Sequence, residues 1–219
     1  MGLYDFSFYD LISRNSVAFA DCLCWREIDD GRQLTFAGYK QQVDQVAAGL
    51  SRIGIKKGDR LGVVGKNSLE FFLVYGAAAA LGAIVLPINW RLSADEMIFN
   101  LNDCEAKIAF VDSEFQQQLA GRRSDLPTVT TFYNLKADLG GAMAFASLLD
   151  APGQVGGNDV GNGDGFVIIH TAAVAGRPRG ALLNHGNILL ASMHFNNYLG
   201  LQTSDVHLNL LPLFHVAGL

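Results

Sequence analysis

Short apolar segments alternate with longer segments of helical periodicity between residues 60 and 133, and this alternation restricts the fold more than any other feature. It predicts strands at residues 60–64, 83–86, 107–111 and 129–133, with helices at residues 68–81, 93–104 and 113–120. Parallel strands need crossover helices between them, and those helices bury both faces of the sheet. The pattern therefore predicts an α/β fold with a doubly wound, mostly parallel sheet and flanking helices.

The residues before this alternation predict a helix, a β-hairpin and a second helix. We expect them at residues 6–15, 20–27 paired with 33–36, and 36–53. Thr35 can cap the second helix, and Gly54 can end it. After the alternation, we expect a short helix at residues 142–149, a glycine-rich linker, a strand at 165–171, a helix at 184–199 and a strand at 206–210.

Composition excludes some classes of function. The chain has 219 residues, of which 50% are hydrophobic and 17% charged, and its net charge is −5. This charge argues against a general nucleic-acid surface. The longest apolar run, residues 71–88, contains Gly82 and Pro87, so it predicts a buried helix followed by a strand and not a transmembrane segment. The first six residues do not have the pattern of a signal peptide.

The cysteines predict no metal site. Cys22 and Cys24 are too close for the usual zinc or redox spacing, and Cys104 is distant in sequence. We interpret Cys22 and Cys24 as small core residues, and reduced thiols fit a cytoplasmic protein.

A loop of small residues follows an apolar strand at residues 166–169. It contains Gly176, Arg177 and Arg179. Small residues allow close approach of a ligand to the backbone, and N–H groups beside cationic side chains suit an anion. The Walker A pattern is absent. From these residues alone, a phosphate cradle and an ordinary turn between two elements are equally well supported.

The loop resembles the signature loop of the adenylate-forming superfamily, which includes acyl-CoA synthetases, peptide-synthetase adenylation domains and luciferases. Its approximate pattern is T-S-G-T-T-G-x-P-K-G, and the residues that match are Thr171, Gly176, Pro178 and Gly180. The family's S-G-T-T is replaced by Ala172, Ala173, Val174 and Ala175. Arg179 replaces the family's lysine.

Two further segments strengthen the resemblance. The segment from Leu211 to Gly218 is similar to the family's P-[LM]-F-H-x-x-G element, and residues 58–89 are similar to its N-terminal region. The three segments occur in the family's order. They imply that residues 1–219 form an incomplete N-terminal adenylation domain, with a first α/β subdomain at about 55–165. Residues 166–219 would hold the signature loop and the start of a second subdomain.

The resemblance also implies a reaction. The intact protein would be an AMP-forming acyl-CoA synthetase acting on medium- or long-chain acids, with ATP, Mg²⁺ and coenzyme A, and it could form a homodimer. The ATP phosphate loop would comprise Thr171, Ala172, Ala173, Val174, Ala175, Gly176 and Arg179. His215 would position the acyl group and the α-phosphate, Phe214 would pack in the site wall, and Gly218 would allow close approach to the acyl chain. The 219 residues alone should be inactive, because the family's later elements, including the magnesium-binding acid and the catalytic lysine, are missing.

The altered loop leaves other functions open. Each lost hydroxyl donor to an ionised phosphate costs about 1.5–3 kcal/mol if nothing replaces it. A non-catalytic ligase-like protein that binds a nucleotide or an acyl ligand is therefore one alternative. An adenylate-forming domain that loads a carrier protein is another. His185 resembles part of a family element, but we favour a helix start capped by Asn184 or Asn187, and we expect His170 to be structural.

Overall fold

The structure is a computed structural model that describes residues 6–136, 142–152, 159–171 and 178–219. Its α-helices are α1 (Phe8–Ala18), α2 (Phe36–Arg52), α3 (Leu69–Leu81), α4 (Ala94–Asp103), α5 (Ser113–Ala120), α6 (Ala146–Leu149) and α7 (His185–Leu199). Its strands are β1 (Leu23–Arg26), β2 (Gln33–Thr35), β3 (Arg60–Val64), β4 (Ile84–Ile88), β5 (Ile108–Val111), β6 (Thr131–Asn134), β7 (Met143–Ala144), β8 (Gly165–His170) and β9 (Gly180–Asn184).

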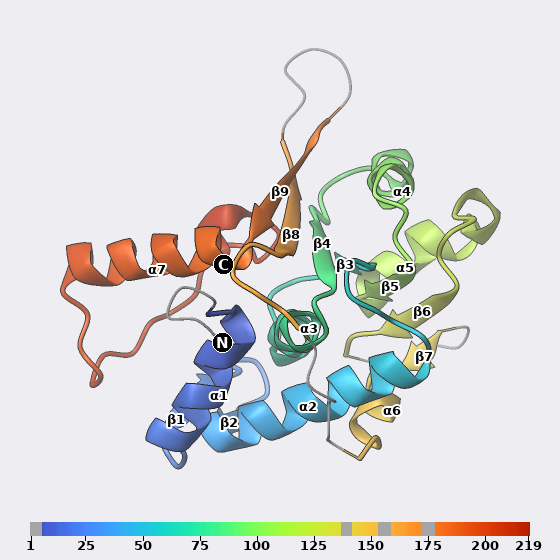
Figure 1. Cartoon of the computed structure of the whole chain (residues 1–219). Helices are drawn as coiled ribbons and strands as arrows, with labels where there is room; N and C mark the ends of the chain where they lie inside the picture. Colours follow the sequence, from blue (N-terminus) through green and yellow to red (C-terminus); the bar gives the residue numbers. More distant parts are fainter. Residues whose placement is uncertain (1–5, 137–141, 153–158, 172–177) are drawn as a thin grey trace.

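A seven-stranded sheet in the order β7-β6-β5-β3-β4-β8-β9 forms the centre of the molecule (Figure 1). Strands β3 to β8 pair in parallel, whereas β9 pairs antiparallel to β8. The predicted mostly parallel α/β sheet is therefore confirmed. Strand β8 joins this sheet through β4, so no break in the sheet accompanies the subdomain boundary predicted near residue 165. That division stays a prediction.

Helices cover both faces of the sheet. Successive residues of a strand point to opposite sides, so the apolar residues of one strand belong to two core clusters. Leu61 and Val63 of β3 belong to the core cluster formed with α1, α2, α3 and α6, while Val64 belongs to the cluster formed with α4 and α5. Figure 1 shows these two helical layers on opposite sides of the sheet. The two layers of helices are those that the strand–helix alternation of the sequence predicts.

Helix α3 is the most deeply buried helix of the described ranges, since every residue except Phe72 is buried. It packs closely against α2 at Gly76, where an added Cβ would lie 2.4 Å from Val43 Cγ2. The apolar run that contains this helix is therefore core, as predicted. Within the described ranges, no helix is long and apolar enough to cross a membrane.

Helix caps agree with the sequence patterns. The Ser93 hydroxyl accepts a hydrogen bond from the Glu96 amide, and the Glu96 carboxylate accepts one from the Ser93 amide. The Thr35 hydroxyl caps α2 in the same way, through the Gly38 amide. These bonds satisfy N–H groups that the first helical turn leaves unpaired.

Four expectations were wrong. Residues 206–210 form no strand, and most of their side chains are exposed. Residues 180–184, for which we predict no strand, form β9. Residues 142–149 contain strand β7 before the short helix α6. Cys22, which we interpret as a core residue, is exposed. The errors over strands lie where pairing with a neighbouring strand, or the lack of it, decides the structure.

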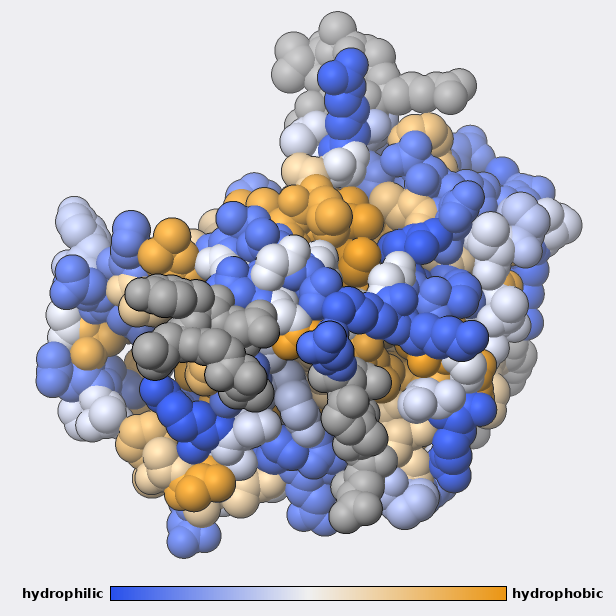
Figure 2. Space-filling view, in the orientation of Figure 1, coloured by the Kyte–Doolittle hydropathy of each residue, from blue (hydrophilic) through white to orange (hydrophobic). Residues whose placement is uncertain are grey.

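Apolar side chains remain exposed on α7 and on the residues that follow it. They include Met193, Phe195, Tyr198, Val206 and Leu210. Figure 2, which shows the face seen in Figure 1, also has hydrophobic residues gathered at the base of the projecting β8–β9 hairpin. Large contiguous apolar surfaces are unusual on monomeric proteins.

Candidate functional site

The segment that carries Phe214 and His215 lies against the turn that follows β3. The Asn67 side-chain amide donates a hydrogen bond from Nδ2 to the Leu211 carbonyl at 2.8 Å, and its Oδ1 accepts one from the Leu213 amide at 2.9 Å. The Tyr75 hydroxyl on buried helix α3 donates to the Leu213 carbonyl at 2.9 Å. Three hydrogen bonds therefore fix the backbone immediately before Phe214.

This position is where an open α/β sheet usually binds its ligands. The chain passes from β3 to β4 on one side of β3, and the next strand, β5, lies on the other side. Such a reversal leaves a crevice at the carboxyl ends of the two strands. The residues after β3 and β5 meet here, since Lys66 Nζ lies 2.8 Å from Glu114 Oε1.

Phe214 packs against an aromatic group that follows β4. Its ring contacts the Trp90 ring edge-on, with 6.4 Å between ring centroids, and Trp90 stacks on Phe115 of α5. Lys66 Nζ lies 5.7 Å from the centroid of the Trp90 ring. Phe214 is half-buried, so its position is compatible with the predicted role in a site wall.

His215 is exposed and precedes a 3₁₀ turn, η2 (Val216–Gly218). Its Nδ1 accepts a hydrogen bond from the Ala217 amide at 3.2 Å, and its own amide donates to the Pro212 carbonyl at 3.0 Å. Because Nδ1 acts as an acceptor, the proton of the neutral ring lies on Nε2. The imidazole can thus offer an N–H donor to a bound group.

Gly218 is required by the fold of its own segment. It is buried, and an added Cβ would lie 2.3 Å from the Pro212 carbonyl oxygen. The close approach that only glycine permits is therefore made by the chain itself. Contact of Gly218 with an acyl chain stays a prediction.

Thr171 and Arg179 lie at the loop end of the β8–β9 hairpin, on either side of residues 172–177. The Thr171 amide donates to the Arg179 carbonyl at 3.0 Å, and the Thr171 hydroxyl lies 3.4 Å from the same oxygen. Both residues are exposed, and within the described ranges no carboxylate pairs with the Arg179 guanidinium. The predicted loop residues Ala172, Ala173, Val174, Ala175 and Gly176 lie outside the described residues.

The predicted site thus consists of two parts. Phe214, His215 and Gly218 lie in one short segment beside the carboxyl end of β3, whereas Thr171 and Arg179 belong to the β8–β9 hairpin. Among the residues that the structure describes, no hydrogen bond, ion pair or ring contact joins the two parts. The sequence indicated Phe214 and His215 but gave no role to Tyr75, whose partner is 138 positions away.

Comparison with known proteins decides the family. A family model described as AMP-binding enzyme matches residues 13–219. The chain belongs to this AMP-binding family. The indoleacetate–CoA ligase of Aromatoleum aromaticum is 32% identical over 190 residues, which cover 86% of this chain and 37% of that protein. The 2-succinylbenzoate–CoA ligase of Bacillus cereus is 27% identical over 195 residues, covering 88% and 36%.

Solved structures agree with the family assignment. A protein provisionally named as a long-chain-fatty-acid CoA ligase, from Rhodopseudomonas palustris, superimposes with a TM-score of 0.91 and 38% identity. The match covers 99% of this chain and 54% of that one. The AMP-binding chain described here therefore spans little more than a third of the curated relatives that it matches.

His185 has a structural role in this AMP-binding chain. Asn184 and Asn187 form a capping box at the start of α7, as the preferred interpretation predicted. His185 is fully buried, stacks on Phe166 at 4.6 Å, and accepts a hydrogen bond at Nδ1 from the Phe8 amide. Burial lowers the pKa of His185 to about 4, so the ring is neutral at physiological pH.

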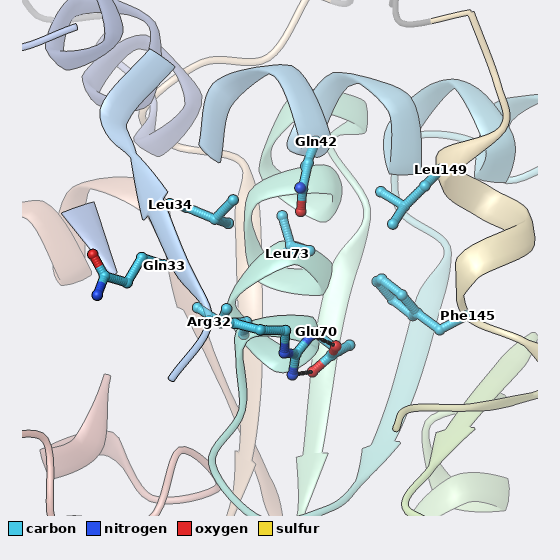
Figure 3. A pocket seen from close by; sticks show the side chains of 9 residues that line it. Arg32, Gln33, Leu34, Gln42, Glu70, Leu73, Phe145 and Leu149 are labelled. Carbon is cyan, nitrogen blue, oxygen red and sulfur yellow. Dashed lines mark hydrogen bonds and ion pairs between the residues drawn. The ribbon is translucent and has the colours of Figure 1, made fainter. Parts of the chain in front are cut away.

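A cavity of about 240 Å³ lies away from the predicted site, between β2, α2, α3 and α6 (Figure 3). Arg32 and Glu70 face each other at its edge, with 3.3 Å between Nη2 and Oε2. The Glu70 carboxylate raises the pKa of Arg32 above its ordinary value. Because the two charges neutralise each other, this cavity offers little net positive charge to an anion.

Proposed function

We propose that this chain is the N-terminal part of an ATP-dependent carboxylic acid–CoA ligase. In the first step, a carboxylate oxygen of the acid attacks the α-phosphorus of ATP, which gives an acyl-adenylate and releases pyrophosphate. In the second step, the thiol of coenzyme A attacks the acyl carbon and releases AMP. The observation that carries the proposal is the docking of the Phe214–His215 segment at the switch point of the sheet, through Asn67.

The loop end of the hairpin would supply a site for the phosphates. Negative charge develops on phosphate oxygens during adenylation, and pre-oriented cations and N–H groups stabilise it. The exposed Arg179 guanidinium can bind two phosphate oxygens at once, and the Thr171 hydroxyl adds a donor. Ala172, Ala173, Val174, Ala175 and Gly176 would contribute backbone amides in place of the family's hydroxyls.

His215 and its neighbours would hold the acid. The exposed Nε2–H of His215 can donate to the carboxylate or to the α-phosphate, and so orient one toward the other. Phe214 would form part of the apolar wall. Mg²⁺ enters the proposal through the family's chemistry alone, since the residues that we assign to the site include no carboxylate to hold it.

The class of acid is a carboxylate with an apolar body. The relatives are named for indoleacetate, 2-succinylbenzoate and long-chain fatty acids. We favour medium- or long-chain fatty acids, because the most similar of these three has that name and is 38% identical. A cytoplasmic location is supported by three free cysteines, and a homodimer stays a family-level prediction.

A second candidate function is binding of a nucleotide or an acyl ligand without catalysis. The replacement of the family's Ser, Gly and Thr residues at positions 172–175 favours it. An adenylate-forming domain that loads a carrier protein is a third candidate, which a carrier domain in the same polypeptide would support.

Acid-dependent exchange between ATP and labelled pyrophosphate tests the proposal. We expect the full-length protein that contains this chain to catalyse exchange with octanoate or palmitate, and the 219-residue chain alone to be inactive. His215→Ala should slow exchange while leaving the thermal unfolding midpoint nearly unchanged. If folded full-length protein shows no exchange with acetate, octanoate, palmitate, benzoate or indoleacetate but still binds ATP, the non-catalytic function is correct.

A further inference from the structure

Three potential metal ligands meet where the end of α4 approaches the end of β8. Asp103 is the last residue of α4, Cys104 is its C-cap, and His170 is the last residue of β8. His170 Nε2 lies 3.4 Å from Asp103 Oδ2 and 3.9 Å from Cys104 Sγ. All three ligand atoms lie within 4.8 Å of one another.

The two distances from His170 Nε2 are close to those in a tetrahedral zinc site. Zn–S bonds of about 2.3 Å and Zn–N or Zn–O bonds of about 2.0–2.1 Å place an N and an S ligand roughly 3.6 Å apart, and an N and an O ligand roughly 3.4 Å apart. The observed separations, 3.9 and 3.4 Å, require shifts of only a few tenths of an ångström. We propose that Asp103, Cys104 and His170 bind a divalent transition-metal cation of the zinc type.

The chemistry of the ligands selects the metal. A thiolate and an imidazole disfavour Mg²⁺ and Ca²⁺, which prefer oxygen ligands, and favour Zn²⁺ or Co²⁺. Three protein ligands leave a fourth position for water. The Asp103 and Cys104 anions would balance the charge of a divalent cation, after the cation displaces the thiol proton.

The surroundings hold the ligands in place. The His170 side chain is only 8% exposed, and its Nδ1 is buried without a hydrogen-bond partner among the described residues. Arg60 fixes the Cys104 backbone by donating to its carbonyl, and the Arg60 charge is paired with Glu105.

Gly180 pairs with His170 across the β8–β9 hairpin. An added Cβ at Gly180 would crowd Ile168 Cγ2 at 2.7 Å and would lie at an ordinary contact distance, 3.5 Å, from His170 Nε2. A cation bound here would join α4 to the strand that ends immediately before Thr171. It would therefore hold the loop end of the hairpin against the helix layer.

A cobalt titration of the metal-free 219-residue chain tests this site. Thiolate–Co²⁺ bonds absorb in the near ultraviolet through charge transfer, and tetrahedral Co²⁺ absorbs in the visible. We expect both signals to appear at one equivalent of Co²⁺ and to disappear when Zn²⁺ is added. Zn²⁺ should also raise the thermal unfolding midpoint, because it binds the folded chain.

Substitutions separate this site from adventitious binding. Cys104→Ser should remove the charge-transfer band, while His170→Gln and Asp103→Asn should each weaken Zn²⁺ binding by at least about tenfold. Cys24→Ser and His207→Gln, which change a distant thiol and an exposed imidazole, should leave binding unaltered. The site does not exist if the folded chain binds no Co²⁺, or if Cys104→Ser retains the band and the affinity.

Discussion

The Asn67 side chain holds the Leu213 amide at 2.9 Å, although the two residues are 146 positions apart. Together with the bond from the Asn67 side chain to the Leu211 carbonyl, this contact places the Phe214–His215 segment beside the carboxyl end of β3. The position of that segment therefore depends on a residue in the turn after β3, and only indirectly on its own sequence.

Asn67→Ala should release this segment. Loss of two partly exposed hydrogen bonds should lower the free energy of unfolding by about 1–2 kcal/mol. Amide hydrogen exchange at Leu213 should become faster, which mass spectrometry or NMR would detect. Asn89→Ala is the matched control, because the Asn89 side chain accepts a bond from the nearby Arg91 amide. Unchanged exchange at Leu213 in Asn67→Ala would contradict the assigned role.

Acidification should destabilise the chain through His185. Burial lowers the pKa of His185 to about 4 in the folded state, against an ordinary value of 6.5, while Asp164 and Asp10 oppose the shift. Above pH 6.5 the ring is neutral in both states, so its contribution is fully present. As the pH falls toward 4, only the unfolded state takes up the proton, and about 3 kcal/mol of stability is lost.

Urea unfolding between pH 7 and 4 measures this loss. His185→Gln keeps an acceptor for the Phe8 amide and removes the titrating group, so its stability should vary much less with pH in this window. The depressed carboxyl pKa of Asp164, caused by Lys57 and the Gly161 amide, acts at lower pH. An equally steep pH dependence in wild type and variant would refute the assignment.

Gly76→Ala should strain the contact between α2 and α3. The added Cβ would lie 2.4 Å from Val43 Cγ2 and 3.0 Å from the Tyr39 hydroxyl. Overpacking of this kind costs about 1–3 kcal/mol, and thermal unfolding would show a lower midpoint. Gly121→Ala is the control, because no atom lies within 4 Å of its added Cβ and its φ is −82°. A midpoint equal to that of wild type in Gly76→Ala would show that the helices separate easily.

The apolar surface of α7 should make the 219-residue chain bind hydrophobic dyes and self-associate. Met193 and Tyr198 are 66% and 87% exposed. The double substitution Met193→Lys and Tyr198→Lys should reduce dye fluorescence and shift the sedimentation profile toward the monomer. Val17→Lys, which changes an isolated apolar residue that is 83% exposed on α1, should do neither. Equal dye binding in all variants would show that the dye binds an apolar surface other than that of α7.

Sequence patterns predicted the elements whose structure depends mainly on residues close together in the chain. Alternation and helical periodicity located the strands and helices between residues 60 and 133, and the cap of α4 followed from Ser93 and Glu96. Strand β9 was not predictable in this way, because a short apolar segment becomes a strand only when β8 lies beside it. The same reason explains the absent strand at residues 206–210, which have no neighbouring strand to pair with in the described structure.

The candidate site was predictable only in part. Phe214 and His215 were found through a family resemblance, and their location at the switch point depends on tertiary contacts with Asn67, Tyr75 and Trp90. The Asp103–Cys104–His170 cluster has no signature in the sequence, because 66 positions separate its thiol from its imidazole. Only the approach of the end of β8 to the end of α4 brings these groups together.

The backbone bond between Thr171 and Arg179 closes the predicted phosphate loop independently of the residues at its tip. Both ends of the loop are held by the register of β8 against β9, whatever residues lie between them. The residues at positions 172–177 can therefore be exchanged together, by selection or by engineering, while the pairing of β8 with β9 is kept. The loss of the family's hydroxyl residues in this chain would then be a change of chemistry that folding did not oppose.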